Sequence, residues 1–400
     1  MPPAELMRPR LVPLEPRPIE LEDGTRAVVL RDPMGILENA AIVSPAAYWV
    51  LAHFDGSREL PDVVRALGEA GVRIRLSDVE RVATQAREAG LVHGPAYRSR
   101  RAEALAAFRA RPRAPACAGG AYPAEETALR EMLAGFYTER GGPGPRDPRS
   151  RVGEHVRLLV APHIDFRRGG ASYAHAYGAL EGCDADLFVV FGTAHASPPH
   201  LYTLTRQDYA TPLGTVATDH EVVNALAAEL TEEDLFADEL VHAGEHSCEF
   251  QMVWLRWVLG DRPFRTVPVL CSSISHLADP AAATGPFLAA LARATRGRKV
   301  CFVAGADLAH VGPQYGDPRS PTPEELAGYA AQDRQTLGFV AGADAAAFHR
   351  DATADAERRR LCGVAPIYAA MRAAGRGARL LHYGQWTDGT DMVSFAAAAG

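Results

Sequence analysis

The stretch Leu158-Leu-Val-Ala-Pro-His163-Ile-Asp165-Phe-Arg decides how the chain is interpreted. A short, continuous apolar run ends at Pro162, and a histidine and an acid follow it at once. Buried parallel strands are apolar throughout, and in open α/β sheets the ligand-binding groups follow the carboxyl ends of such strands. The stretch therefore predicts a buried strand that delivers His163 to a functional crevice.

The same pattern recurs further along the chain. The apolar run 186–192 leads into Thr193-Ala-His195, and the run 299–305 leads into Asp307-Leu-Ala-His310. Because the carboxyl ends of parallel strands meet at one edge of a sheet, the three strand ends are expected to bring a histidine each to one crevice. We take this crevice as the functional centre.

Length and composition set the broad class of the protein. A chain of 400 residues exceeds the usual size of one core, so two domains are expected. The net charge of −7 gives no reason to expect nucleic acid or an anionic membrane as a partner. The start of the chain lacks a signal-peptide pattern, and no apolar run reaches the roughly 18 residues of a spanning helix. The sequence predicts a cytoplasmic protein.

The six cysteines are scattered and form no Cys-x-x-Cys pair. This spacing argues against a disulfide framework and against a structural zinc site. Cys301, inside a predicted buried strand, and Cys271, at the end of the run 265–270, are interpreted as core thiols.

The first 97 residues predict a small α+β domain. Two short strands flank a turn at 22–25, and a helix starts at Ser44-Pro45 with a good N-cap. A second helix is expected over about 60–67, and a third with a capping box at Ser77-x-x-Glu80. Three helices with a small sheet are typical of a winged-helix domain. Eleven arginines against fourteen acids in residues 1–97 speak against DNA binding.

Two segments of this domain carry a resemblance. Ser44-Pro-Ala-Ala-Tyr-Trp-Val-Leu and Phe54-Asp-Gly-Ser-Arg-Glu-Leu-Pro-Asp-Val-Val64 resemble the PqqD-like peptide-recognition domains. The resemblance implies a winged-helix domain that holds a peptide as an added strand on its sheet edge. The alternative is a degenerate module that merely docks on a neighbour.

Residues 98–115 are rich in arginine, proline and alanine and are interpreted as a linker. Within them, 111–115 should be extended and solvated. The second domain then covers 116–400. Its apolar runs alternate with helical patterns, which predicts a parallel or mixed sheet covered by helices on both faces. The helices are expected over 173–180, 219–230, 246–259, 280–296, 323–341 and 364–373, and closing strands over 380–386 and 392–397.

Several motifs of this domain are similar, in order, to those of the Memo family. They are Ala118-Gly-Gly-Ala-Tyr-Pro, Ala161-Pro-His-Ile-Asp, Gly192-Thr-Ala-His, Glu245-His-Ser-Cys-Glu-Phe-Gln, Val267-Pro-Val-Leu, Asp307-Leu-Ala-His and Cys362-Gly. The resemblance implies a LigB-type fold, as in class III non-haem-iron extradiol dioxygenases. It also implies system protein B of the AmmeMemoRadiSam grouping, and with it a radical-SAM protein partner.

By this resemblance, His163 and His195 match the two histidine ligands of a divalent metal, with Fe(II) expected first and Cu or Zn as alternatives. The resemblance places the third ligand at Ala309, whose side chain cannot bind a metal. Three possibilities stay open: a neighbour such as Asp307 or His310 substitutes, a two-histidine site binds weakly, or the metal is lost. Asp307 is our candidate for the third ligand.

Other residues are candidates for contact with the substrate. His246 and Glu249 lie three apart at a helix start and project to one side, which suits an acid/base pair or a second shell of ligands. His310 is a further candidate base. Asp165 and Cys362 are candidate substrate-binding residues, Cys362 through its match to a family motif.

Two hypotheses for function follow, and whether the protein is an enzyme stays open between them. The first is a metal-binding enzyme of oxidoreductase type that acts on a small or peptide-borne substrate. The second is a non-catalytic adaptor that presents a ribosomally made peptide to a radical-SAM partner. Ala309 favours the second hypothesis, and the presence of His163, His195, His246 and Glu249 favours the first.

Overall fold

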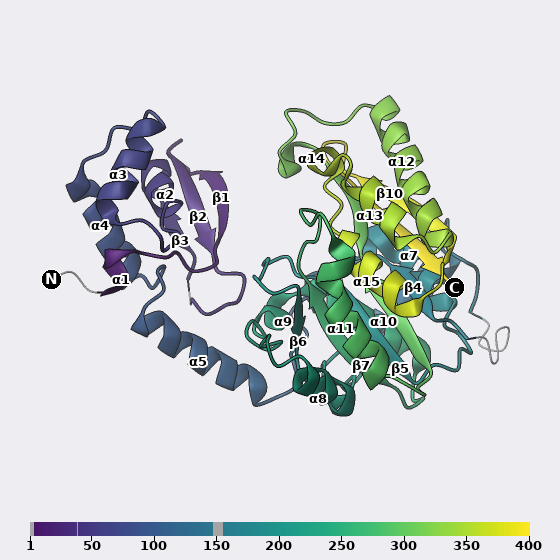
Figure 1. Cartoon of the computed structure of the whole chain (residues 1–400). Helices are drawn as coiled ribbons and strands as arrows, with labels where there is room; N and C mark the ends of the chain where they lie inside the picture. Colours follow the sequence, from purple (N-terminus) through teal and green to yellow (C-terminus); the bar gives the residue numbers. More distant parts are fainter. Residues whose placement is uncertain (1–3, 38, 147–154) are drawn as a thin grey trace. The chain divides into compact units, whose positions relative to one another are not determined.

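The computed structural model describes residues 4–37, 39–146 and 155–400 (Figure 1). The chain divides into two compact units, Met1–Ala110 and Arg111–Gly400, each with a hydrophobic core of its own. The division falls inside the segment that the sequence marks as a linker.

The amino-terminal unit combines a three-stranded antiparallel sheet, in the order β1-β2-β3, with short helices. Its elements are α1 (Ala4–Met7), β1 (Glu15–Glu20), β2 (Arg26–Arg31), β3 (Ala41–Val43), α2 (Pro45–Leu51), α3 (Leu60–Glu69), α4 (Leu76–Glu88) and α5 (Pro95–Arg109). The β1–β2 hairpin closes at the predicted turn, where Asp23 Oδ1 accepts a hydrogen bond from the Thr25 N–H. β3 lies at one edge of this sheet.

The helix starts of this unit differ in how they are capped. α2 begins as predicted, with the Ser44 hydroxyl accepting the Ala47 N–H (3.2 Å) and Pro45 in the first turn. The capping box predicted at Ser77 was wrong, because α4 already begins at Leu76 and has no side-chain cap. Asp78 in its first turn lies where the helix dipole favours a negative charge, which stabilises the start without a cap.

The carboxy-terminal unit is built on an eight-stranded mixed sheet. The strand order is β10-β11-β4-β8-β5-β7-β6, and β9 pairs separately with β11. β4, β8, β5 and β7 are parallel, whereas β6, β9, β10 and β11 pair antiparallel with their neighbours. The strands are β4 (Leu158–Ala161), β5 (Leu187–Thr193), β6 (Tyr202–Leu204), β7 (Arg265–Cys271), β8 (Val300–Gly305), β9 (Asp307–Val311), β10 (Arg379–Thr387) and β11 (Met392–Ala399).

Helices cover both faces of this sheet, which confirms the predicted fold class (Figure 1). They are α6 (Glu126–Thr138), α7 (Phe166–Gly178), α8 (His220–Glu229), α9 (Val241–Gly244), α10 (His246–Leu259), α11 (Pro280–Ala294), the 3₁₀ helix η1 (Pro313–Tyr315), α12 (Pro323–Ala341), α13 (Ala345–Thr353), α14 (Ala356–Arg359) and α15 (Val364–Ala374). On one face, Val189 and Phe191 of β5 join a core with residues of α11 and α15. α10 begins against the other face.

Two glycines allow α10 to begin so close to the sheet. A Cβ at Gly192, in β5, would lie 2.7 Å from the Cys248 sulfur, and one at Gly305, the end of β8, would lie 2.6 Å from the Ser247 carbonyl oxygen. Real Cβ atoms do not approach other atoms so closely. Glycine at both positions therefore lets the first turn of α10, and with it His246, reach the strand ends.

The strand ends themselves are level. Gly305 pairs in register with Ala161 of β4 on one side and with Gly192 of β5 on the other. The chain segments that leave these strands therefore start from one line at the carboxyl edge of the sheet. This register brings His163, His195 and Asp307 to the same place.

The segment 111–115 corrects one prediction. It was expected to be solvated, but the Arg113 side chain is buried, with 1% of the residue exposed. Arg113 belongs to the carboxy-terminal unit and makes its contacts there.

Candidate metal centre

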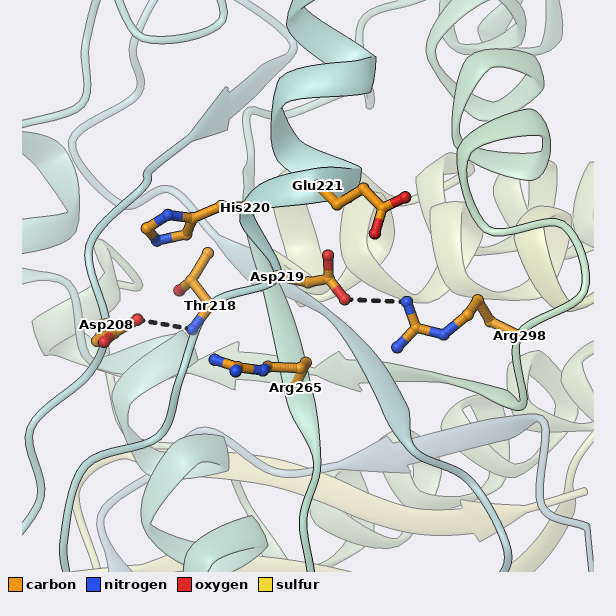
Figure 2. Close-up of a pocket in the computed structure, with 7 residues that line it drawn as sticks. All are labelled: Asp208, Thr218, Asp219, His220, Glu221, Arg265 and Arg298. Carbon is orange, nitrogen blue, oxygen red and sulfur yellow. Dashed lines mark hydrogen bonds and ion pairs between the residues drawn. The ribbon is translucent and has the colours of Figure 1, made fainter.

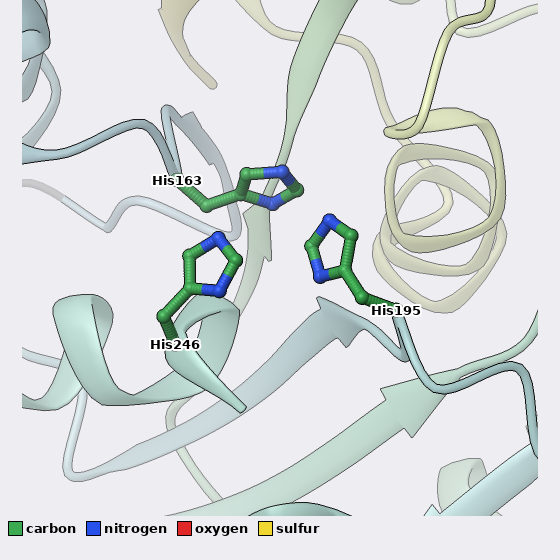
Figure 3. Close-up of side chains that lie close together, drawn as sticks. All are labelled: His163, His195 and His246. Carbon is green, nitrogen blue, oxygen red and sulfur yellow. The ribbon is translucent and has the colours of Figure 1, made fainter. Parts of the chain in front are cut away.

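Three imidazoles converge at the carboxyl edge of the sheet (Figure 3). His163 follows β4, His195 follows β5, and His246 is the first residue of α10. One nitrogen from each ring lies within 4.8 Å of the others, so the three can hold a divalent metal ion. Among the described residues, these three form the one group of histidine, cysteine or acidic side chains whose ligand atoms lie close enough together to hold a metal ion.

The outward Nδ1 atom of each ring faces an oxygen. His163 Nδ1 lies 3.0 Å from the Gly305 carbonyl oxygen. His195 Nδ1 and His246 Nδ1 lie 3.0 Å and 3.2 Å from the carboxylate of Glu245. An oxygen acceptor beside Nδ1 holds the proton there and leaves Nε2 with a free lone pair. The arrangement orients three Nε2 atoms as ligands.

Glu245 links two of the three imidazoles. It is buried, and it also accepts the main-chain N–H groups of His195 (3.0 Å) and Ser247 (2.9 Å). Burial by itself would raise the pKa of the Glu245 carboxyl. The opposing effects of His195, His246 and the Ser247 N–H are together larger, so the pKa lies well below its usual range. Glu245 is therefore ionised at neutral pH and acts as a fixed acceptor.

His163 and His246 are suited to be ligands because burial favours their neutral rings. Burial, followed by the neighbouring His195 and His246, holds the pKa of His163 well below its usual range. Burial also lowers the pKa of His246, against the opposing effect of Glu245. A metal needs the unprotonated ring, so no proton has to leave these side chains at neutral pH.

Two further donor atoms lie beside His163. The Cys362 sulfur is 3.2 Å from His163 Nε2, and Asp307 Oδ2 is 3.6 Å from the same atom. The other Asp307 oxygen accepts the His163 N–H (2.9 Å). Burial raises the pKa of Asp307 to about 7, and it raises the pKa of the Cys362 thiol well above its usual range. Either group can add the negative charge that imidazole ligands do not supply.

Ala309 does not lie in this centre. Its side chain is part of the hydrophobic core, and its N–H donates to the Ser394 hydroxyl (2.9 Å). Ala309, the position at which the resemblance places the third ligand, therefore faces the core. The third imidazole of the centre comes from His246.

The imidazoles open onto a cavity of about 570 Å³. Its polar lining includes Asp165, Arg168, Asp307 and His310. Burial lowers the pKa of His310 to about 4, and its Nδ1 lies 3.1 Å from the Leu308 carbonyl oxygen. Asp165 is the N-cap of α7 and binds Arg168. Of the candidates from the sequence, His163, His195, His246, His310, Asp165 and Asp307 line this one cavity, and Cys362 contacts His163.

Glu249 lies behind the cavity, not in its lining. Its side chain is fully buried and forms an ion pair with Arg113, and it accepts hydrogen bonds from the Tyr122 hydroxyl and from the Cys117 N–H (3.0 Å). Arg113 also donates to the carbonyl oxygens of His242 (2.8 Å) and Glu245 (2.9 Å). The pair therefore fixes the segment that ends at Glu245 and leads into His246, the first residue of α10.

Sequence reasoning missed Arg113 and Glu245 as residues of the site. Arg113 lies in a proline-rich stretch with no periodic pattern, and nothing in the sequence links it to Glu249, 136 residues later. Glu245 did carry a signal, because it directly precedes a histidine that was already a candidate. A carboxylate beside a candidate histidine ligand is the usual partner of its second ring nitrogen.

A second hollow lies elsewhere on the carboxy-terminal unit (Figure 2). Its lining is Asp208, Thr218, Asp219, His220, Glu221, Arg265 and Arg298. Asp219 already binds Arg298 (3.1 Å), and Asp208 accepts the Thr218 N–H (2.8 Å). Because these acids are engaged within the hollow, it gives no reason to place the chemistry there.

Cys271 and Cys301 fit the interpretation as core thiols that the sequence favours. All six cysteines are described and none is in a disulfide, and Cys271 and Cys301 are buried in the core. His242, close to the site in sequence, is buried and accepts the Tyr209 hydroxyl at Nδ1 (2.7 Å) while its Nε2 faces the Thr203 carbonyl (3.0 Å). Across the described ranges, no helix has the length and apolar character needed to traverse a bilayer.

Comparison with known proteins adds the family. Residues 113–399 match the family model of the Memo-like proteins. The MEMO1 family protein MTH_45 of Methanothermobacter thermautotrophicus is 31% identical over 204 residues, which are 50% of this chain and 71% of the relative. A MEMO1 family protein of Aquifex aeolicus is 24% identical over 317 residues, 78% of each chain. One of Methanococcoides burtonii is 28% identical over 297 residues, 71% of this chain and 98% of its own.

Proposed function

This chain belongs to the Memo family, and from that premise we propose that its carboxy-terminal unit is a divalent-metal enzyme of oxidoreductase type, similar to the class III non-haem-iron extradiol dioxygenases. Fe(II) is the proposed metal, with Cu or Zn as alternatives. The observation that supports the proposal is the convergence of three imidazoles whose Nδ1 atoms are all occupied by oxygen acceptors.

His163, His195 and His246 would hold the ion through Nε2, and Cys362 or Asp307 would add an anionic donor. When bound, the ion supplies Lewis-acid polarisation of a substrate oxygen and, as Fe(II), one-electron redox chemistry. Glu245 keeps two of the rings in position throughout.

The same cavity offers a base. His310 carries its proton on Nδ1, donated to the Leu308 carbonyl oxygen, so Nε2 can accept a proton from a substrate hydroxyl. Its lowered pKa keeps the ring neutral at pH 7, which is the form that a base needs. Asp165 remains a proposed substrate contact. Cys362, expected from the sequence to bind substrate, is proposed here as a donor to the ion because its sulfur lies beside His163. We propose that Glu249 acts by holding the wall of the cavity in place.

Metal analysis tests the proposal. The metal content of protein purified without added metal is compared between the wild type, His163→Ala/His195→Ala and His246→Ala. His200→Ala is the matched control, because His200 binds Asp238 (3.0 Å) and does not line the cavity. We expect about one ion per chain in the wild type and the control, and a loss in both other variants. Equal metal content in all four proteins would reject the assignment.

A second function is proposed for the amino-terminal unit, namely binding of an extended peptide along β3, as in PqqD-like domains. The observation that favours it is an open sheet edge with exposed apolar side chains. Among the strands of the described residues, β3 has a partner on one side only. Ile42 within it is 60% exposed, and Trp49 of α2 is 55% exposed. An exposed edge strand is a template for an added strand.

Peptide titration tests this second function. Precursor peptides encoded beside the gene are titrated against the full chain, and duplex DNA serves as the counter-probe. Ile42→Lys and Trp49→Ala should weaken peptide binding at least about tenfold. Leu21→Lys, at an exposed apolar position beyond the end of β1, should not weaken it. Tight binding of DNA with no binding of any peptide would reverse the assignment.

A further inference from the structure

The cavity of the three imidazoles also contains a cation that the proposed metal chemistry does not use. Arg168, in the first turn of α7, lines the cavity together with the imidazoles. Its charge reaches the groups around it: burial raises the pKa of Asp307 and of Tyr315 and lowers that of His310, and Arg168 opposes the two rises and adds to the fall. Among the described residues that line the cavity, Arg168 is the one arginine, and none is a lysine.

The guanidinium of Arg168 is held on two sides. Its Nε donates to Asp165, and its carbon atom lies 4.6 Å from the centre of the Trp386 ring. Over residues 4–37, 39–146 and 155–400, its two terminal nitrogens make no hydrogen bond. Arginine binds carboxylates with paired N–H groups in a fixed plane, so a guanidinium held in place at Nε presents its free end to a ligand.

The acids of the cavity do not compete for that free end. Asp165 is engaged with the Arg168 Nε and with the Arg168 N–H. Asp307 is engaged with the His163 N–H. An anionic group of a ligand therefore meets a cation whose terminal donors are available.

One wall of the cavity is apolar. Ile164 and Val393 form a small buried cluster with Phe395, against which Tyr315 packs. Ile164, Val393, Tyr315 and Phe250 all line the cavity. Ligand cavities that combine an apolar wall with a few fixed polar groups bind small molecules by their apolar body and orient them by the polar contacts.

We infer that Arg168 is the specificity-determining residue of this cavity and binds the carboxylate of a small acid whose apolar body packs against Ile164, Tyr315 and Val393. The inference rests on the proposed function in one respect, that the cavity of the three imidazoles is the substrate site. The carboxylate anchors the molecule at Arg168, so that its other end is directed toward the imidazoles.

A pair of probes with one shape and different charge tests the inference. Benzoate and benzamide are titrated by calorimetry at constant ionic strength into the full-length protein, after removal of metal by chelation and again after loading with Zn²⁺. The metal-free arm matters because a carboxylate can also bind a metal ion. We expect metal-free protein to bind benzoate at least about tenfold more tightly than benzamide, the effect of a hydrogen bond to a charged group.

Variants test whether the difference in affinity between benzoate and benzamide depends on Arg168. Arg168→Gln should bind the two probes equally, and Arg168→Lys should keep part of the preference because it keeps the charge but loses the planar pair of donors. Arg167→Gln is the matched control, since Arg167 is the adjacent arginine in the same turn and does not line the cavity. It should keep the full preference.

The outcomes separate this inference from the proposed metal centre. His163→Ala/His195→Ala should retain the preference for benzoate even where metal is lost. If the protein binds metal as proposed but has equal affinity for benzoate and benzamide, the role of Arg168 is rejected and the metal centre is not. A preference that survives in Arg168→Gln, or that disappears in Arg167→Gln, would overturn it as well.

Discussion

The carboxylate of Glu245 accepts both the main-chain N–H and the ring Nδ1 of His195, each at 3.0 Å. The same carboxylate lies 3.2 Å from Nδ1 of His246. One buried side chain therefore sets the position and the tautomer of two candidate ligands that come from different elements. Glu245 itself accepts a hydrogen bond from the main-chain N–H of Ser247, the second residue of α10.

Glu245→Gln is expected to weaken metal binding about 10- to 100-fold, because the amide can no longer accept a hydrogen bond from both rings with a full negative charge. The measurement is a competition titration with a chelator that reports Zn²⁺ affinity. Glu229→Gln, which changes an exposed glutamate paired with Arg293, is the control and should have wild-type affinity. Equal affinities in Glu245→Gln and the control would show that the rings are positioned without the carboxylate.

Cys362 is expected to bind the ion as a thiolate, because its sulfur lies 3.2 Å from His163 Nε2 and a metal displaces the proton of a coordinating thiol. The Co²⁺-loaded wild type should then show a sulfur-to-cobalt charge-transfer band that Cys362→Ser lacks. Cys117→Ser removes a thiol that lines the cavity, and it should keep the band. A spectrum that is unchanged in Cys362→Ser would leave Asp307 as the source of negative charge.

Arg113→Met is expected to destabilise the protein by about 3–5 kcal/mol, because it leaves the buried Glu249 carboxylate without its counter-charge. Adding Glu249→Gln should recover part of this loss, since the neutral side chain can still accept from Tyr122 and Cys117. Urea unfolding of the two single variants and the double variant measures the coupling. Additive losses would mean that the two charges do not depend on each other.

His242 should make the protein sensitive to acid. Burial lowers its pKa to about 3, whereas the unfolded value is near 6.5, so the unfolded state binds the proton first as the pH falls. Its contribution to stability is complete above pH 6.5 and is lost between pH 6.5 and about 3, by up to about 1.4 kcal/mol per pH unit.

This acid effect is measured by urea unfolding at pH 7.5 and pH 5.5. His242→Gln should be less stable than the wild type at pH 7.5, because the Tyr209 and Thr203 hydrogen bonds are perturbed. The difference in free energy of unfolding between the wild type and His242→Gln should be smaller at pH 5.5 than at pH 7.5. A difference that stays constant between the two pH values would contradict the assignment.

Much of the fold can be predicted from local pattern. The apolar runs before His163 and His195 are β4 and β5, and α10 and α12 have the predicted bounds, 246–259 and 323–341. Such signals are local, because a buried parallel strand is apolar throughout and an amphipathic helix shows its periodicity within its own sequence. Memo-family membership, expected from ordered motifs, is confirmed by the match over residues 113–399.

The third imidazole shows what local pattern cannot provide. His246 was grouped with Glu249 because both lie on one side of a helix, but the structure places His246 with His163 and His195, and Glu249 with Arg113. The difference arises from the close approach of α10 to Gly192 and Gly305, a contact between segments more than 50 residues apart. Ala309 agrees with the expectation that it offers no ligand, but its burial in the core depends on packing that the local sequence does not reveal.

Arg113 also affects how the carboxy-terminal unit is isolated for study. The match to the family begins at this residue, whereas composition alone places the domain start at 116. A fragment cut at 116 would lack the guanidinium that neutralises Glu249 and that binds the carbonyl oxygens of His242 and Glu245. Loss of metal affinity in such a fragment would then reflect a missing structural residue and not an inactive centre, so expression boundaries should fall before Arg111.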